Sequence, residues 1–297
     1  MQDLHERGLE EILRKDRMGS EEGAMKYAIL STTTDEEYSF YAPITARMWV
    51  EIGYKPYVFL GGSVAKDWIP NKANNVVFKE LNSLCLEGRE IAFARGCSKQ
   101  LSIKLVRWYA ACLSFFKPDD YLLTSDIDLW PLSFAWYSSQ DPEKRYHLFN
   151  GDIHGGVMHS TCHIGASADR WRSLMKIKAG DDIVNRIELA TEEAFKRHDS
   201  SWIGRRSDEQ FMKSRILDHP SYPADFEFIN RGTPPEGRID RESWPEKVES
   251  GGGAAIDAHL LRPGTDPRVW KRVREVLPSH LRDWAESYRA EYMEARG

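Results

Sequence analysis

The sequence predicts an α/β fold: a Rossmann-type mixed sheet with a parallel amino-terminal half, a mixed second half and helices on both faces. First, residues 27–62 contain an apolar run, an amphipathic stretch and a second apolar run. This order of strand, helix and strand is the pattern of a right-handed parallel crossover unit. Second, this alternation continues up to residue 132, as in an open parallel sheet. Third, the later apolar runs contain more polar residues, which favours antiparallel additions.

The bulk composition is that of a soluble globular enzyme, with 297 residues, 41% hydrophobic and 29% charged. We expect an amino-terminal charged helix or extension at 1–24 and a single domain with carboxyl-terminal helices at 25–297. A net charge of −5 argues against a nucleic-acid partner. The charged amino terminus, four scattered cysteines and lack of a membrane-length apolar run predict a cytoplasmic protein without a membrane span.

The first half of the chain supplies the parallel part of the sheet. Pro43 suits the first turn of a helix and Gly53 its end. Lys104 and Arg107 lie on one flank of a later apolar stripe. In order, we expect a charged helix at 3–16, strands at 27–32, 55–62, 76–81 and 121–124, and helices at 43–52 and 99–116.

The second half is predicted to add mixed strands and further helices. Residues 217–253 are rich in Pro, Gly, Arg and Asp and predict a long functional or disordered loop. Ser207 begins a capping box that starts a helix. We expect strands at 146–152 and 157–166, joined by a turn around 155–156, and helices from 168, at 182–197, at 207–217, at 267–277 and at 279–295, while residues 254–261 turn apolar again around Asp257 and His259.

Two carboxylates follow the apolar run 121–124, namely Asp126 and Asp128. On an extended chain, residues two apart point to the same side. Two adjacent like charges are costly without a cation between them, and a hard divalent ion with oxygen ligands fills that role. The alternative is that both aspartates only cap the following turn.

The ends of three predicted strands carry polar or glycine residues. These are the run 31–34, the pair Gly61–Gly62 and the Asp126/Asp128 pair. Ligands of open parallel sheets bind beyond the carboxyl ends of the strands. We therefore expect these three segments to share one edge of the sheet and to form a ligand site there.

Four segments resemble the GT-A class of nucleotide-sugar glycosyltransferases: STTT (31–34), SDID (125–128), SDEQ (207–210) and IDAHLLRP (256–263). More loosely, SDIDLWPL and GRIDRESW are similar to stretches of small glycosyltransferases encoded by chlorella viruses. The resemblance implies a GT-A-like fold whose mixed half binds the acceptor. It also implies a UDP-sugar donor, with a GDP-sugar less favoured, and a carbohydrate acceptor.

The resemblance implies a metal site for Mn²⁺ (or Mg²⁺). Asp128 would be a direct ligand, Asp126 would hold the ribose hydroxyls or the metal through water, and His259 would complete the shell. Such an ion neutralises the leaving diphosphate. The alternative for His259 is a packed or surface histidine.

The resemblance also implies which residues contact the nucleotide. The segment after the first strand would hold the base, basic residues would reach the phosphates, and arginines of the long loop would close over the donor. The alternatives are solvated helix charges and a plain exposed loop. These candidates are Ser31, Thr32, Thr33, Thr34, Tyr38, Arg95, Lys99, Lys104, Arg238 and Arg241.

Asp208 and Glu209 are the candidate catalytic residues. In the first helical turn they suit the positive end of the helix dipole, which alone explains them. In the GT-A class such an acid acts as base or stabilises the sugar cation, so either stereochemical outcome is open.

The leading hypothesis is a metal-dependent hexosyl- or pentosyltransferase that moves a sugar from a UDP-sugar to a glycan or other hydroxyl acceptor. One alternative is a nucleotidyltransferase acting on sugar phosphates, but the segment STTTDEE (31–37) lacks that class's Gly-rich phosphate loop with a Lys. The other is a non-catalytic nucleotide-sugar-binding module, which would not need the Asp pair and a late His.

Overall fold

The structure is a computed structural model that describes residues 23–84, 87–138, 140, 143–149, 161–197, 207–229 and 237–297. The helix predicted at 3–16 lies outside the described residues, as do positions 150–160, which include the predicted turn around 155–156 and the adjoining ends of the strands predicted at 146–152 and 157–166. Within the described part of the chain, no helix is both long and apolar enough to cross a membrane.

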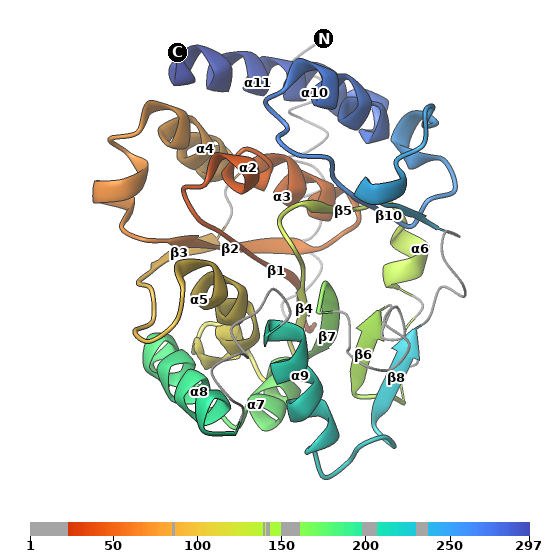
Figure 1. Cartoon of the computed structure of the whole chain (residues 1–297). Helices are drawn as coiled ribbons and strands as arrows, with labels where there is room; N and C mark the ends of the chain where they lie inside the picture. Colours follow the sequence, from red (N-terminus) through yellow and green to blue (C-terminus); the bar gives the residue numbers. More distant parts are fainter. Residues whose placement is uncertain are drawn as a thin grey trace.

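The main sheet has seven strands in the order β3-β2-β1-β4-β7-β6-β8 (Figure 1). Strands β1, β2, β3 and β4 are mutually parallel neighbours, β7 runs antiparallel to β4 and β6, and β8 is parallel to β6. The predicted parallel half and mixed half are confirmed. The strands span Lys26–Thr32 (β1), Lys55–Gly61 (β2), Glu87–Ile91 (β3), Tyr121–Thr124 (β4), Tyr146–Phe149 (β6), His163–Ser167 (β7) and Phe226–Ile229 (β8).

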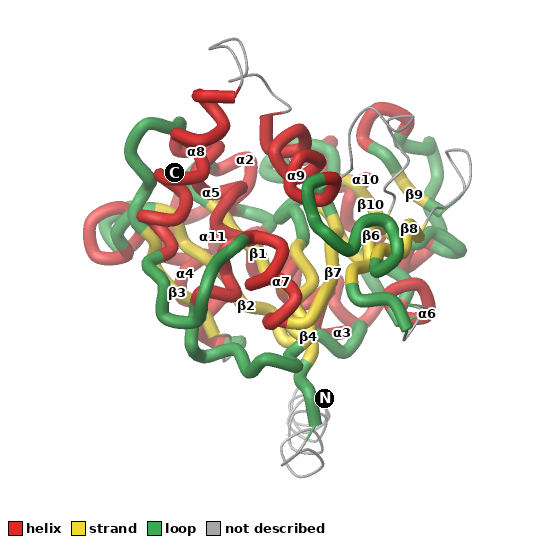
Figure 2. The backbone as a smooth tube through the Cα atoms, turned by 90° about the horizontal axis from the view of Figure 1, so that it is seen from below, coloured by secondary structure: helices red, strands yellow, loops and turns green. Residues whose placement is uncertain are grey.

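A second sheet of three short strands has the order β5-β10-β9. Strand β10 (Asp257–His259) pairs antiparallel with β5 (Leu129–Pro131) and parallel with β9 (Arg238–Ile239). In Figure 2, β9 and β10 lie on the same side of the molecule as β6 and β8. The small sheet therefore joins the segment after β4 to the carboxyl-terminal part of the chain.

Helices cover both faces of the main sheet, as predicted. Successive β1 side chains point to opposite faces, and the apolar side chains on each face are buried under helices. Ala28 and Leu30 belong to one buried core, and Tyr27 and Ile29 to the other. On the first face lie α2 (Glu36–Ser39), α3 (Ala42–Glu51), α4 (Lys72–Ser83), α10 (Pro267–Val273) and α11 (Arg282–Arg296) (Figure 1). On the second lie α5 (Lys99–Val106), α7 (Ala168–Met175), α8 (Ile183–Arg197) and α9 (Ser207–Leu217), while α6 (Phe134–Tyr137) lies near β6.

The strand predicted at 76–81 is wrong, because these residues belong to helix α4. Asn71 caps its first turn through a side-chain hydrogen bond to the Asn74 amide of 2.9 Å. Val77 and Leu81, four residues apart, are buried on the same helix face. The third strand of the parallel half is β3 instead. Its sequence EGREI has mostly polar side chains because β3 is an edge strand, so no apolar run marks it.

Two further predictions are corrected by local structure. The helix predicted at 99–116 ends as α5 at Val106 and continues as the 3₁₀ helix η2 (Arg107–Cys112). The segment 217–253 is not one long loop, because it contains β8, a strand of the main sheet, and β9, a strand of the small sheet. It also contains the 3₁₀ helices η4 (Arg241–Ser243) and η5 (Ser250–Gly252). Short pairings of this kind depend on distant partner strands and leave little periodicity in the sequence.

Candidate functional site

The predicted ligand edge exists at the carboxyl ends of β1, β2 and β4. In the parallel register Ile29 aligns with Thr124, and Thr32 aligns with Leu60. The Ser125 amide donates to the Ile29 carbonyl oxygen at 3.0 Å, so the chain leaves the sheet beside β1. The segments 31–34 and 125–128 and the Gly61–Gly62 pair therefore share one edge, as the alternation of strands and helices predicts.

Asp128 and His259 are brought together by the small sheet. His259 aligns with Leu129 in the β5–β10 pair, and the Leu260 amide donates to the Asp128 carbonyl oxygen at 2.9 Å. As a result, Oδ2 of Asp128 lies 4.0 Å from Nε2 of His259. Two residues 131 positions apart in the sequence thus meet at the carboxyl edge, because β5 follows Asp128 directly and pairs with β10.

Cations surround the Asp128 carboxylate, which is 8% exposed. Nη2 of Arg241 donates to Oδ2 of Asp128 at 2.5 Å, and Nε of Arg262 lies 3.6 Å from the same oxygen. Arg241 Nη2 also contacts Nε2 of His259. On the other side of the imidazole, Nδ1 lies 3.5 Å from Oδ2 of Asp240. The hydrogen bond from His259 lowers the pKa of Asp240 to about 2.

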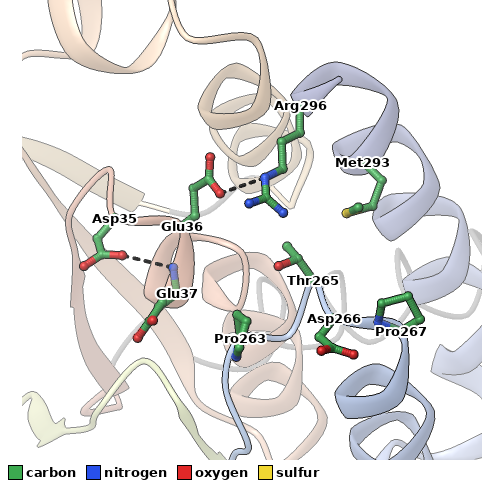
Figure 3. Close-up of a pocket in the computed structure, with 9 residues that line it drawn as sticks. All are labelled: Asp35, Glu36, Glu37, Pro263, Thr265, Asp266, Pro267, Met293 and Arg296. Carbon is green, nitrogen blue, oxygen red and sulfur yellow. Dashed lines mark hydrogen bonds and ion pairs between the residues drawn. The ribbon is translucent and has the colours of Figure 1, made fainter.

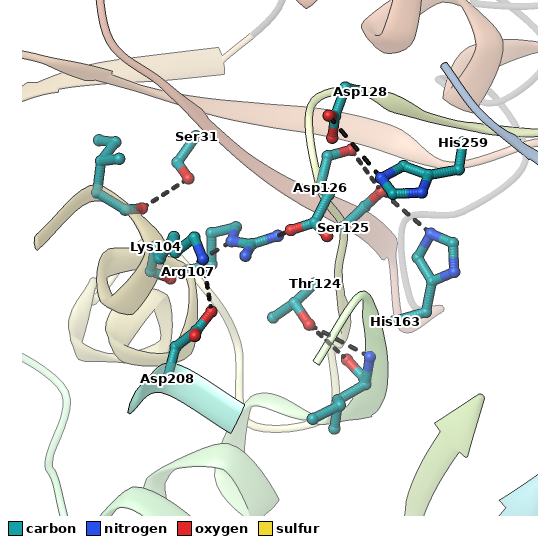
Figure 4. A network of polar contacts seen from close by, with 12 residues as sticks. Ser31, Lys104, Arg107, Thr124, Ser125, Asp126, Asp128, His163, Asp208 and His259 are labelled. Atoms are coloured by element: carbon teal, nitrogen blue, oxygen red, sulfur yellow. Dashed lines mark hydrogen bonds and ion pairs between the residues drawn. The ribbon is translucent and has the colours of Figure 1, made fainter. Parts of the chain in front are cut away.

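Asp126 belongs to a different group of charges (Figure 4). Its Oδ1 forms an ion pair of 2.7 Å with Nη1 of the buried Arg107. Burial alone would raise the pKa of Asp126, but the positive charges of Arg107 and Lys104 outweigh it and lower that pKa. Nζ of Lys104 lies 3.1 Å from Oδ2 of Asp208, which is buried at the start of α9. Burial would lower the Lys104 pKa, but the charges of Asp208 and Asp126 raise it.

A buried polar network supports the site from behind. Ser125 Oγ lies 3.1 Å from His163 Nε2, and His163 Nδ1 lies 3.1 Å from the Tyr137 hydroxyl. Tyr137 donates to Asp257 at 3.4 Å. Arg238 binds the Asp257 carboxylate with two hydrogen bonds of 2.8 and 3.0 Å. The network therefore links the residue before Asp126 to β10 and β9.

Arg238 is accordingly tied to the framework of the small sheet. Burial would lower its pKa, but the charge and hydrogen bonds of Asp257 raise it. Of the two arginines predicted to close over a donor, Arg241 reaches Asp128, whereas Arg238 faces the fully buried Asp257. A guanidinium held by two charge-assisted hydrogen bonds to a buried carboxylate is costly to move.

The predicted base-binding segment is held by hydrogen bonds within itself and to α5 and α4. Ser31 donates to the Ile103 carbonyl at 2.7 Å, which ties β1 to α5. Thr32 donates to the Thr33 carbonyl at 3.1 Å, and the Thr33 hydroxyl accepts from the Asp35 amide at 3.2 Å. The Thr34 carbonyl accepts from Asn74 at 3.3 Å. These contacts define the shape of the segment.

The remaining predicted residues differ in how near they lie to the Asp pair. The Arg262 guanidinium stacks over the Tyr38 ring at 4.5 Å, which connects Tyr38 to the Asp128 group. Lys99 instead lies over the Phe93 ring at 5.3 Å. The Arg95 amide donates to Glu188 of α8 at 2.7 Å. Glu209 follows Asp208 in the first turn of α9 and is partly buried.

An open pocket of about 640 Å³ lies beside this edge, between α2, the segment before α10 and the end of α11 (Figure 3). Four of its nine lining residues are acidic, and one of these, Glu36, pairs with Arg296 at 2.8 Å. Glu37 lies 3.8 Å from Arg262 and so connects the pocket wall to the Asp128 group. The lining residues are Asp35, Glu36, Glu37, Pro263, Thr265, Asp266, Pro267, Met293 and Arg296.

The Asp128 and His259 side chains are close enough together to share a divalent ion. Ligand atoms lie about 2.0–2.2 Å from such ions, so two ligands of one ion are at most about 4.4 Å apart, and the observed separation is 4.0 Å. In the part of the chain that the structure describes, no group of three or more His, Cys, Asp or Glu side chains is gathered as a metal site. Of the three predicted ligands, Asp128 and His259 meet, while Asp126 faces Arg107.

Two residues of the site were not among the predicted contacts. Arg107 pairs with Asp126, and Arg262 lies against Asp128. Arg107 follows Lys104 by three residues on one helix flank, a spacing that places both on the same face. Arg262 is part of the segment 256–263 that carries the family resemblance. Both features can be seen in the sequence, but neither indicates which carboxylate the arginine contacts.

Comparison with solved structures finds similarity to glycosyltransferases of the GT-A class. The glycosyltransferase involved in glycosylation of the major capsid of PBCV-1 is 12% identical, covers 84% of this chain and 98% of that chain, and has a TM-score of 0.39. The galactosyltransferase LgtC in complex with donor and acceptor sugar analogs is 12% identical, covers 86% and 99%, and has a TM-score of 0.44.

A third structure is the Drosophila β1,4-galactosyltransferase 7 in complex with manganese, UDP-Gal and xylobiose. It is 12% identical, covers 80% of this chain and 72% of that chain, and has a TM-score of 0.36. No family model and no curated protein matches the chain. Similarity at this level concerns the fold alone, so a function has to be argued from the geometry of the site.

Proposed function

We propose that the protein is a metal-dependent glycosyltransferase that moves a hexose or pentose from a UDP-sugar to a hydroxyl group of a carbohydrate acceptor. The observation that carries the proposal is the meeting of Asp128 and His259, 4.0 Å apart, at the carboxyl edge of a parallel sheet. An oxygen and an imidazole ligand surrounded by arginines suit a divalent ion together with a diphosphate.

The residues of the site have distinct roles in this proposal. Asp128 and His259 hold Mn²⁺ or Mg²⁺, which supplies Lewis-acid stabilisation of the leaving diphosphate. Arg241 and Arg262, both near Asp128, are the guanidinium donors nearest to such a diphosphate. Asp126, kept ionised beside Arg107, accepts hydrogen bonds from ribose hydroxyls.

Asp208 is the proposed catalytic carboxylate. Lys104 holds it at 3.1 Å and also contributes to the field around Asp126, so Asp208 faces the same group of charges. In this position it either takes the proton of the acceptor hydroxyl or stabilises the positive charge that develops on the sugar. Glu209, next to it on α9, is the second acidic candidate.

The test measures UDP release from UDP-sugars with Mn²⁺, and thermal stabilisation by the same ligands. We expect Asp128→Asn to keep the fold but to lose metal-dependent nucleotide binding. The matched control is Asp283→Asn, at an exposed position of α11. The proposal fails if no UDP- or GDP-sugar stabilises the wild type with Mn²⁺, or if Asp128→Asn binds UDP with unchanged metal dependence.

A further inference from the structure

One arginine occupies the space between the two proposed metal ligands. Nη2 of Arg241 lies 2.5 Å from Oδ2 of Asp128 and also contacts Nε2 of His259. These two ligand atoms are themselves only 4.0 Å apart. The guanidinium therefore satisfies both atoms at once, in the place that an ion shared between them would take.

An ion and this guanidinium exclude each other on both steric and electrostatic grounds. An ion bound to both atoms would lie about 2.0–2.2 Å from each of them. Nη2 of Arg241 already contacts the same two atoms, so the ion and Nη2 would overlap. Two positive charges at that separation also repel strongly. Arg262 differs, because its Nε is 3.6 Å from Asp128 Oδ2 and its guanidinium rests on the Tyr38 ring. It can stay in place beside the ion.

Arg241 is placed where a small rearrangement releases it. It is the first residue of the three-residue helix η4, and only Asp240 separates it from the two-residue strand β9. Arg238 anchors that strand to Asp257, so the backbone before Arg241 is held in place, and the Arg241 side chain itself is 19% exposed. Nε of Arg241 is buried and has no hydrogen-bond partner among the described residues. This donor is available to an acceptor such as a phosphate oxygen.

We propose that Arg241 is a placeholder cation. While no ion is bound, it holds Asp128 and His259 together and neutralises the carboxylate. When an ion enters, Arg241 leaves the two ligands and donates to the donor diphosphate. Arg241 then opposes metal binding and favours nucleotide binding, two effects of opposite sign from one residue. The inference rests on the metal site of the proposed function.

The experiment is isothermal titration of the purified full chain with Mn²⁺ in the absence of nucleotide, using the wild type, Arg241→Gln and Arg262→Gln. In the wild type, the charge-assisted hydrogen bond from Arg241 must be broken before Mn²⁺ binds, and this lowers the affinity for Mn²⁺ about tenfold or more. Arg241→Gln should therefore bind Mn²⁺ about tenfold or more tightly than the wild type. Arg262→Gln, which removes an equal charge beside the same oxygen, should change the affinity much less.

A second titration uses UDP at saturating Mn²⁺, where Arg241→Gln should bind UDP more weakly than the wild type. Equal tightening of Mn²⁺ binding by both variants would show general charge repulsion and overturn the placeholder role. Unchanged or weaker Mn²⁺ binding by Arg241→Gln overturns it as well, with the metal site intact. If neither the wild type nor Arg241→Gln binds Mn²⁺, the metal site itself fails. Arg241→Met, which also removes the charge, repeats the test should the Gln variant not fold.

Discussion

Asp257→Asn should destabilise the protein strongly, because it leaves a buried guanidinium without its counter-charge. Asp257 is fully buried and receives two hydrogen bonds from Arg238, of 2.8 and 3.0 Å, whose side chain is 12% exposed. Breaking a buried ion pair by removing one partner costs about 3–5 kcal/mol. At about 2–3 °C per kcal/mol for a large domain, the melting temperature should fall by roughly 6–15 °C.

The measurement is urea and thermal unfolding of Asp257→Asn beside a matched control, Asp225→Asn. Asp225 also pairs with an arginine, Arg145, but at 3.6 Å and with that arginine 49% exposed, so its loss should cost at most about 1 kcal/mol. Replacing the buried pair by apolar residues, Asp257→Leu with Arg238→Met, should recover most of the lost stability. Equal stability of the two Asn variants would refute the assignment of Arg238 and Asp257 to the framework.

Two further predictions concern a site cation and a buried thiol. Lys104→Met should lower kcat/KM about tenfold or more, because Lys104 holds the proposed catalytic carboxylate Asp208 at 3.1 Å and one charged hydrogen bond is worth about 1.5–3 kcal/mol. Lys72→Met, exposed on α4, serves as control in the same steady-state assay, and an equal kcat/KM in both variants would contradict this positioning role of Lys104. Burial raises the pKa of Cys112 to about 12, whereas an unfolded thiol titrates near about 8.5. The free energy of unfolding of the wild type, relative to that of Cys112→Ala, should therefore fall above about pH 8.5, by up to about 1.4 kcal/mol per pH unit. Urea unfolding of both proteins across this pH range measures the difference, and a difference that does not change with pH would contradict the prediction.

The parallel half of the sheet was predictable because its strands are buried on both faces. Residues 27–32, 55–61 and 121–124 are therefore apolar runs that stand out in the sequence. Once these strands are parallel, the common edge of Thr32 and Asp126 follows from topology alone. The edge strand β3 was missed and α4 was misassigned for the converse reason. An edge strand needs few apolar residues, and the apolar residues 76–78 form an uninterrupted run within α4 that is ambiguous without its cap.

The partners of the charged residues were less predictable than their location. The resemblance to a known family pointed to His259, and the β5–β10 pairing does place it beside Asp128. Nothing in the sequence indicates that Arg241 reaches the same carboxylate or that Arg238 is committed to Asp257. These pairings depend on a two-residue strand and a three-residue strand, whose formation is decided by tertiary contacts rather than by local propensity.

The two aspartates show how a local rule fails at a functional edge. Side chains two apart share a side only while the chain stays extended, but β4 ends at Thr124 and residues 127–128 form a turn. Asp126 therefore faces Arg107, whereas Asp128 faces Arg241 and Arg262. Each carboxylate has its own cations, so no shared ion is needed to offset repulsion between them. Within the proposed function, this division is the reason for assigning the metal to Asp128 and the ribose hydroxyls to Asp126.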